Sequence, residues 1–143
     1  MFLNLYAHKL PVLSISISSD NYMLCSGSAD KNIKLWGLDF GNVHRSIFAH
    51  ASAVLQVSFI KDTHYLVSIS KDQVAKFWDM DTYENIFQFD KSIHPLSAMV
   101  VTSIGDRVYI SDMGGPIHIY GQTKEQAIYS DEVQQRENKE SLE

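Results

Sequence analysis

Three residue types recur along this chain at one constant spacing, and no other feature constrains the fold as strongly. The pairs His8 and His50, Asp30 and Asp72, and Trp36 and Trp78 are each separated by 42 residues. In both copies an Ala-His pair precedes an apolar run, and the aspartate lies six residues before the tryptophan. A period of about 40–45 residues with these markers is typical of one β-propeller blade.

The residues between the markers have the pattern of short strands. Apolar runs occur at 12–18, 23–29, 32–36 and 45–50, and again at 54–59, 65–70, 74–80 and 85–90. Turn residues separate them, and none of the intervening stretches has a helical period. Residues 1–6 fit an outer strand that precedes His8. The sequence therefore predicts an all-β fold of four-stranded antiparallel blades.

A third unit keeps the strand pattern but loses the markers. The positions 42 residues after His50, Asp72 and Trp78 are Ser92, Gly114 and Tyr120. An aromatic residue at 120 keeps the packing role of the tryptophan, but the polar network is expected to be absent. His94 comes two residues late and precedes a proline, so it is not counted as an equivalent. Runs at 97–103, 107–112, 116–122 and 126–130 still resemble strands.

These units predict a division of the chain into four parts. They are a first blade with its leading outer strand at 1–43, a second blade at 44–85, a degenerate third blade at 86–130, and an acidic polar tail at 131–143. The tail is expected to be disordered or a solvated helix. Closed propellers typically have four to eight blades, so three describe a partial propeller. We expect a fragment or reduced relative; oligomerisation or blades from another subunit are the alternatives.

The recurrent polar residues are predicted to hold each blade together. A carboxylate can accept hydrogen bonds from the N–H groups that a tight turn leaves unpaired. A histidine can donate to it, a serine can bridge to the histidine, and the tryptophan N–H can complete the network. Ser26 and Ser68 are the candidates for the bridging serine, with Ser28 and Ser70 as competing choices.

The same residues also allow a catalytic interpretation, in which Asp30, His8 and Ser26 form a hydrolytic triad. Repetition argues against it, because Asp72, His50 and Ser68 would then form a second active site. A buried network would also leave no access for substrate. We expect no catalytic, cofactor-binding or metal-binding residues, and therefore a protein that is not an enzyme and has no small-molecule substrate.

Composition excludes several other classes of protein. The net charge is −5 and shows no basic patch, which disfavours direct high-affinity nucleic-acid binding. No uncharged apolar run approaches the ~20 residues that a membrane span needs. The histidines lack the paired spacing of zinc ligands, and 79–84 lacks the glycine and distal glutamate of a calcium loop. Cys25 is the only cysteine, so no internal disulfide is possible; this fits the cytosol or nucleus.

The stretch GSADKNIKLWGLDFGNVHRSIFAH, residues 27–50, resembles the WD-repeat family. More narrowly, residues 2–129 resemble the C-terminal propeller blades of the Dip-two-type WD-repeat subunits of the UTP-B subcomplex, which associates with the U3 small nucleolar RNA. Gly37 departs from the family pattern, which places aspartate after the tryptophan. The motif residues of the family are structural, so the resemblance carries over no catalytic role.

The resemblance implies a scaffold in ribosome biogenesis, within the small-subunit processome that matures 18S ribosomal RNA. It implies other processome WD-repeat proteins as partners, indirect contact with pre-ribosomal RNA and U3 through the complex, and a nuclear, nucleolar location. The alternative is a WD-repeat adaptor of another pathway, such as a ubiquitin-ligase substrate receptor or a signalling scaffold.

Overall fold

The computed structural model describes residues 4–39, 41–89, 94–102 and 107–121, and within these ranges every regular element is a β-strand. The first sheet contains β1 (Val12–Ile17), β2 (Met23–Ser28), β3 (Asn32–Gly37) and β4 (Val43–Phe48). The second contains β5 (Val54–Phe59), β6 (Tyr65–Ser70), β7 (Ala75–Asp79) and β8 (Glu84–Gln88). The third contains β9 (Leu96–Val101), β10 (Arg107–Asp112) and β11 (Ile117–Gly121).

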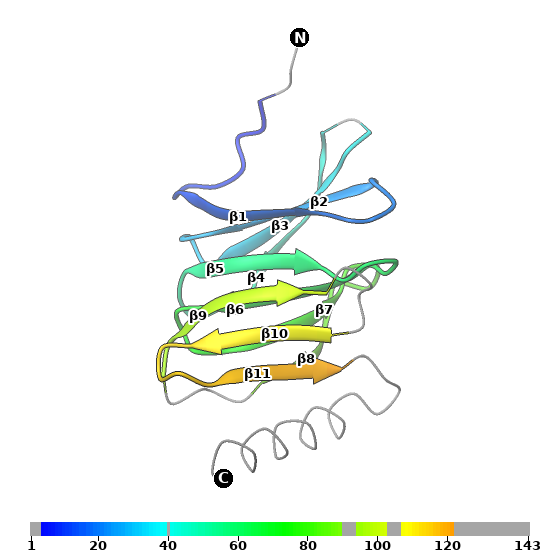
Figure 1. Cartoon of the computed structure of the whole chain (residues 1–143). Coiled ribbons are helices and arrows are strands. Elements are labelled where there is room, and N and C mark those ends of the chain that lie inside the picture. Colours follow the sequence, from blue (N-terminus) through cyan, green and yellow to red (C-terminus); the bar gives the residue numbers. More distant parts are fainter. Residues whose placement is uncertain (1–3, 40, 90–93, 103–106, 122–143) are drawn as a thin grey trace.

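The three sheets follow one another as propeller blades (Figure 1). Each is an antiparallel meander in which neighbouring strands in the sequence pair with each other. The first strands of the sheets lie along one side of the molecule, where β1 contacts β5 and β5 contacts β9. The predicted fold class, all-β propeller blades of WD-repeat type in a partial propeller, is confirmed.

Two apolar cores hold the sheets together, one on each face of the second sheet. The first core joins the first and second sheets and includes Cys25, Leu35, Val57 and Trp78. The other joins the second and third sheets and includes Phe77 and residues of β9 to β11. Successive strand residues point to opposite faces, so Trp78 enters the first core and its neighbour Phe77 the second. This explains why β6 is buried at every position after its first residue.

Polar side chains on the first strand of one sheet bind the backbone of the next sheet. The Ser14 hydroxyl accepts from the Val57 N–H at 3.1 Å. One repeat later, the Gln56 amide accepts from the Met99 N–H at 3.0 Å and donates to the Met99 carbonyl at 2.7 Å. These contacts occupy backbone groups of a first strand that its own ladder leaves open, and they set the register between sheets.

Two predicted strands are not seen among the described residues. The leading strand expected at 1–6 is irregular over 4–6, and 1–3 lie outside the described residues. The first sheet has β4 as its outer strand, and residues 4–6 add no strand to that sheet. The run at 126–130 and the tail at 131–143 also lie outside the described residues. The strand β4 belongs to the first sheet, although most of it falls within the second sequence unit at 44–85. The boundaries of the units at 1–43 and 44–85 stay a prediction.

Gly27 in β2 packs tightly against valine side chains of β5 in the second sheet. A Cβ atom built on Gly27 would lie 2.8 Å from the Val54 Cγ1 atom and 3.0 Å from Val57 Cγ1. Carbon atoms do not approach so closely without displacing one another, so any side chain at 27 would push the sheets apart.

We therefore expect Gly27→Ala to lower the free energy of unfolding by about 1–3 kcal/mol, the usual cost of overpacking a core. Chemical denaturation measures this. Because Val54→Ala removes the nearest methyl groups, the double variant should lose less stability than the sum of the two single variants. Strict additivity would show that contact with Val54 is not the cause.

Candidate functional site

The predicted polar residues of the first sheet form one hydrogen-bonded network. His8 Nδ1 lies 2.8 Å from Asp30 Oδ2, and His8 Nε2 lies 2.8 Å from Ser26 Oγ. Trp36 Nε1 donates to the same Ser26 oxygen at 3.1 Å. The four side chains come from the segment before β1, from β2, from the β2–β3 turn and from β3. The structure thus brings together all four residues that the sequence proposed for this unit.

The second sheet repeats the network atom for atom. His50 lies 3.1 Å from Asp72 Oδ2 and 2.8 Å from Ser68 Oγ, and Trp78 Nε1 donates to Ser68 at 2.9 Å. Both histidine side chains are fully buried. The competing serines have another task, because Ser28 Oγ and Ser70 Oγ accept the backbone N–H of the aspartate two residues later. They therefore bind the turn and not the histidine.

Each aspartate organises a turn whose backbone needs side-chain acceptors. Lys31 follows Asp30 with φ at 76°, in the left-handed region that non-glycine residues rarely adopt. Asp30 Oδ1 accepts from the Asn32 N–H at 3.0 Å, which stabilises the turn around that residue. Burial disfavours the charged carboxylate, but the hydrogen bonds from Asn32 and His8 outweigh it and hold the pKa of Asp30 below its ordinary value. Asp30 is therefore an ionised acceptor at neutral pH.

The direction of each hydrogen bond in the second network follows from donor counting. The indole N–H can only donate, so Ser68 Oγ accepts from Trp78 and has its own proton left for His50 Nε2. His50 Nδ1 then carries the ring proton and donates to Asp72. This arrangement needs a neutral imidazole. Burial does lower the pKa of His50, and the attraction of Asp72 only partly opposes this.

This geometry resembles a Ser-His-Asp triad, but the serine is poorly placed for catalysis. Ser68 has no exposed surface and Ser26 only 3%. Each hydroxyl oxygen also accepts a hydrogen bond from an indole N–H. A nucleophile must reach a substrate carbonyl, and these oxygens are enclosed between strands. The arrangement is suited to fixing strands and turns.

The third sheet has a different polar cluster, which sequence reasoning missed. Asp112 Oδ1 accepts from the Gly114 N–H at 2.8 Å, as Ser70 does for Asp72, and Asp112 Oδ2 pairs with His118 at 3.0 Å. Burial opposes ionisation of Asp112, but the bonds from His118 and Gly114 hold its pKa below the ordinary value. The signal available in the sequence was that Asp112 lies 42 residues after Ser70.

The ring of His94, which the sequence spacing had excluded, packs against Gly114. A Cβ atom at Gly114 would collide with that ring, so the glycine makes room for it. Ser92 lies outside the described residues. Tyr120 is buried and contacts Phe77, Phe87 and Phe89 edge-on, with ring centroids 5.4–6.1 Å apart. An aromatic side chain thus packs at the tryptophan position.

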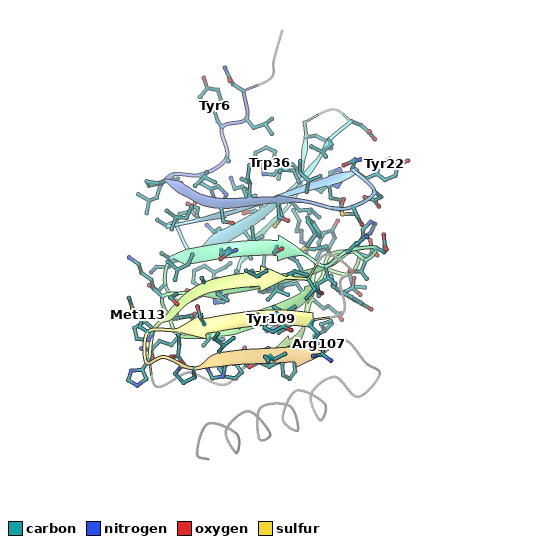
Figure 2. All side chains as sticks on the ribbon, in the orientation of Figure 1. Tyr6, Tyr22, Trp36, Arg107, Tyr109 and Met113 are labelled. Atoms are coloured by element: carbon teal, nitrogen blue, oxygen red, sulfur yellow. The ribbon has the colours of Figure 1, made fainter. Side chains whose placement is uncertain are left out.

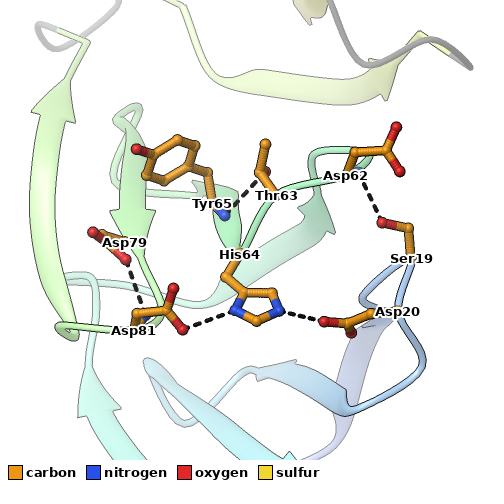
Figure 3. Close-up of a pocket in the computed structure, with 8 residues that line it drawn as sticks. All are labelled: Ser19, Asp20, Asp62, Thr63, His64, Tyr65, Asp79 and Asp81. Atoms are coloured by element: carbon orange, nitrogen blue, oxygen red, sulfur yellow. Dashed lines mark hydrogen bonds and ion pairs between the residues drawn. The ribbon is translucent and has the colours of Figure 1, made fainter.

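A hollow of about 620 Å³ lies at the opposite end of the sheets from the Asp30 and Asp72 turns (Figure 3). Its walls come from the β1–β2, β5–β6 and β7–β8 turns. Four carboxylates line it together with one histidine, His64: Asp20, Asp62, Asp79 and Asp81. The sequence identified these segments only as turns, because the residues converge through the stacking of two sheets.

The described part of the chain offers few groups for metal binding or thiol chemistry. No three His, Cys, Asp or Glu side chains there are grouped so that they could hold a metal ion. Cys25 is fully buried, and burial raises the pKa of its thiol. Among the described residues we find no helix with the length and apolarity that a membrane span requires.

Comparisons with known proteins agree with this architecture. The family model described as "WDR3 second beta-propeller domain" matches residues 1–127. No match is found among curated proteins. Among solved structures, the chain is similar to the crystal structure of the computationally designed Ika4 protein, with a TM-score of 0.73 and 23% sequence identity. That similarity covers 82% of this chain and 70% of the designed one, and it supports the fold alone.

We expect Asp72→Ala to lower the free energy of unfolding by about 1–3 kcal/mol, because the turn N–H groups and His50 lose their acceptor. Asp30→Ala should behave in the same way. Thermal or chemical denaturation measures both. Asp39→Ala, on the exposed β3–β4 turn, is the matched control and should change little. If Asp39→Ala and Asp72→Ala gave equal losses, the network would have no special role in stability.

Proposed function

The chain belongs to the WDR3 second β-propeller family, a WD-repeat scaffold family, and from this premise we propose that it acts in ribosome biogenesis as a non-catalytic interaction scaffold. The proposed setting is the small-subunit processome, which is associated with the U3 small nucleolar RNA and processes 18S pre-ribosomal RNA. The proposed location is the nucleolus. The observation that carries the proposal is the family match over 1–127, together with polar networks that fix the blades.

A scaffold role is supported by where the polar chemistry lies. The histidines, serines and aspartates that could have formed an active site are used to fix strands and turns. Because the blades are rigid, the connecting loops provide the surface to which partners can bind. We therefore assign the chain protein partners, chiefly other processome WD-repeat proteins.

Contact with RNA is proposed to be indirect. The net charge of the chain is −5, and one end of the sheets carries four aspartates around the hollow. Such a surface repels phosphate groups, whereas RNA-binding surfaces usually concentrate Lys and Arg. Pre-ribosomal RNA and U3 would then be held by partner proteins.

The open face of the first sheet supports attachment of a further blade. Ile15 is 63% exposed, whereas Val57, one repeat later, is 2% exposed beneath the first sheet. Ile17 is 51% exposed, whereas Phe59 is 7%. Trp36 also lies on this side, away from the second sheet (Figure 2). The internal repeat therefore provides a template for the missing partner, namely a β-sheet that covers Ile15 and Ile17.

The internal repeat also indicates which kind of side chain the partner sheet needs in order to bind the backbone of β1. In the two internal joints Ser14 and Gln56 bind the backbone of the next first strand. The same position in the third sheet is Ala98, whose methyl group cannot make this bond. A second copy placed on β1 by its third sheet would lack the bond, so we propose a blade of different sequence as the occupant.

Sedimentation velocity tests the open face. We expect the isolated chain to associate or aggregate, and Ile15→Glu with Ile17→Glu to reduce this because charges would replace the apolar contact. Ile86→Glu, on the outer strand β8, is the control and should leave association unchanged. A compact, non-aggregating monomer of the unmodified chain would contradict the need for a further blade.

Co-purification tests the cellular role. We expect the tagged protein to retain processome WD-repeat proteins and U3, measured by mass spectrometry and RNA quantification. Treatment with ribonuclease should remove U3 and leave the proteins bound, since the proposed RNA contact is indirect. Recovery of ubiquitin-ligase or signalling proteins without U3 would favour the adaptor alternative. Loss of the proteins with the RNA would refute indirect contact.

A further inference from the structure

His64 stands between two carboxylates that come from different sheets (Figure 3). Its Nε2 atom lies 2.6 Å from Asp20 Oδ2, in the β1–β2 turn of the first sheet. Its Nδ1 atom lies 2.8 Å from Asp81 Oδ1, in the β7–β8 turn of the second sheet. His64 itself belongs to the β5–β6 turn, so one ring connects three turns around the hollow.

Donor counting determines the charge of this ring. An ionised carboxylate has no proton to give, so a histidine nitrogen facing it must carry the proton of the hydrogen bond. Both nitrogens of His64 face carboxylates, and both must therefore donate, as only the imidazolium cation can. Asp20 is held as an acceptor, because Oδ1 receives the Ser18 hydroxyl at 2.6 Å and the Tyr22 N–H at 3.1 Å. The Ser18 and His64 bonds lower the pKa of Asp20 to about 2.

We propose that His64 is a pH-dependent clamp, which in its protonated form joins Asp20 of the β1–β2 turn to Asp81 of the β7–β8 turn and on losing its proton releases the Asp81 carboxylate. The network at the other end of the sheets works in the opposite sense. There the neutral His50 ring accepts the Ser68 hydroxyl proton on Nε2, and burial favours the neutral ring by lowering the pKa of His50. The joint between the first two blades thus contains two histidines with opposite protonation preferences.

Which bond His64 loses first depends on how firmly each of the two carboxylates is held by other groups. Neutral imidazole has one N–H, so it can keep only one of the two bonds. Asp20 is held by Ser18 and Tyr22 and is 38% exposed, whereas the Asp81 side chain is 63% exposed and readily hydrated. We therefore expect the Asp20 bond to persist and the Asp81 side chain to turn toward solvent, while the Met80 N–H keeps its bond to the His64 carbonyl at 3.0 Å.

The surroundings of His64 favour the protonated form of its ring. Asp20 bonds it from the β1–β2 turn and Asp81 from the β7–β8 turn, and these bonds raise its pKa above the ordinary 6.5. Asp79 and Asp62 add negative charge around the hollow, and Tyr65 lines it from β6. Because the folded-state pKa is raised, this contribution to stability is complete below pH 6.5 and is lost as the pH rises through the pKa of His64.

A titration of the full chain by NMR tests the clamp. Long-range ¹H–¹⁵N spectra should show both His64 ring nitrogens protonated below the pKa of His64, and His64 should titrate above 6.5. Asp81→Asn should lower the His64 pKa more than Asp62→Asn, since Asp62 lines the same hollow without bonding the ring. High salt should reduce the Asp81 effect, because the group is exposed.

A second measurement compares denaturation midpoints of the unmodified chain and His64→Gln across pH. Glutamine cannot carry the charge, so the stability advantage of the unmodified chain should shrink as the pH rises from 6 to about 9. The effect of His50 is present in both proteins and cancels. A His64 that titrates at or below 6.5, equal effects of Asp81→Asn and Asp62→Asn, or a pH-independent advantage would each overturn the proposal.

Discussion

Each complete blade depends on one serine hydroxyl that is shared between an indole and an imidazole. Ser68 accepts from Trp78 and lies 2.8 Å from His50, so it joins the second and third strands of its sheet to the segment that precedes the first. Since the imidazole then reaches Asp72, the turn between those strands is fixed by the same chain of bonds. Removing one member leaves the others buried without partners, which is why such networks form as complete units.

Stacking of the blades depends on a second kind of contact, from a side chain to a neighbouring backbone. Ser14 and Gln56 differ in length, yet each reaches the backbone of the next first strand. Gly27 allows the close approach that these bonds need. Ala98 cannot continue the series, so the two ends of this stack are chemically different. That asymmetry gives a propeller assembled from such blades a defined order.

The two ends of the sheets also differ in charge. At one end the histidines and aspartates are nearly all buried and mutually satisfied. At the other, four aspartates surround His64 in an open hollow. The acidic surface thus lies at one end of the sheets, and the buried polar networks lie at the other.

The sequence by itself determined the blade architecture and the members of both networks, because His, Asp and Trp at a fixed period act locally within one repeat. It also identified Tyr120 as an aromatic at the tryptophan position. It did not find the Asp112–His118 pair, because residues of other types occupy those two repeat positions in the first two blades. It did not place His94, because that residue is two positions off the repeat period and meets Gly114 only through folding of the third sheet. The hollow around His64 was decided by tertiary structure alone. Its carboxylates come from turns of two different sheets, and no spacing within one repeat records how neighbouring sheets stack.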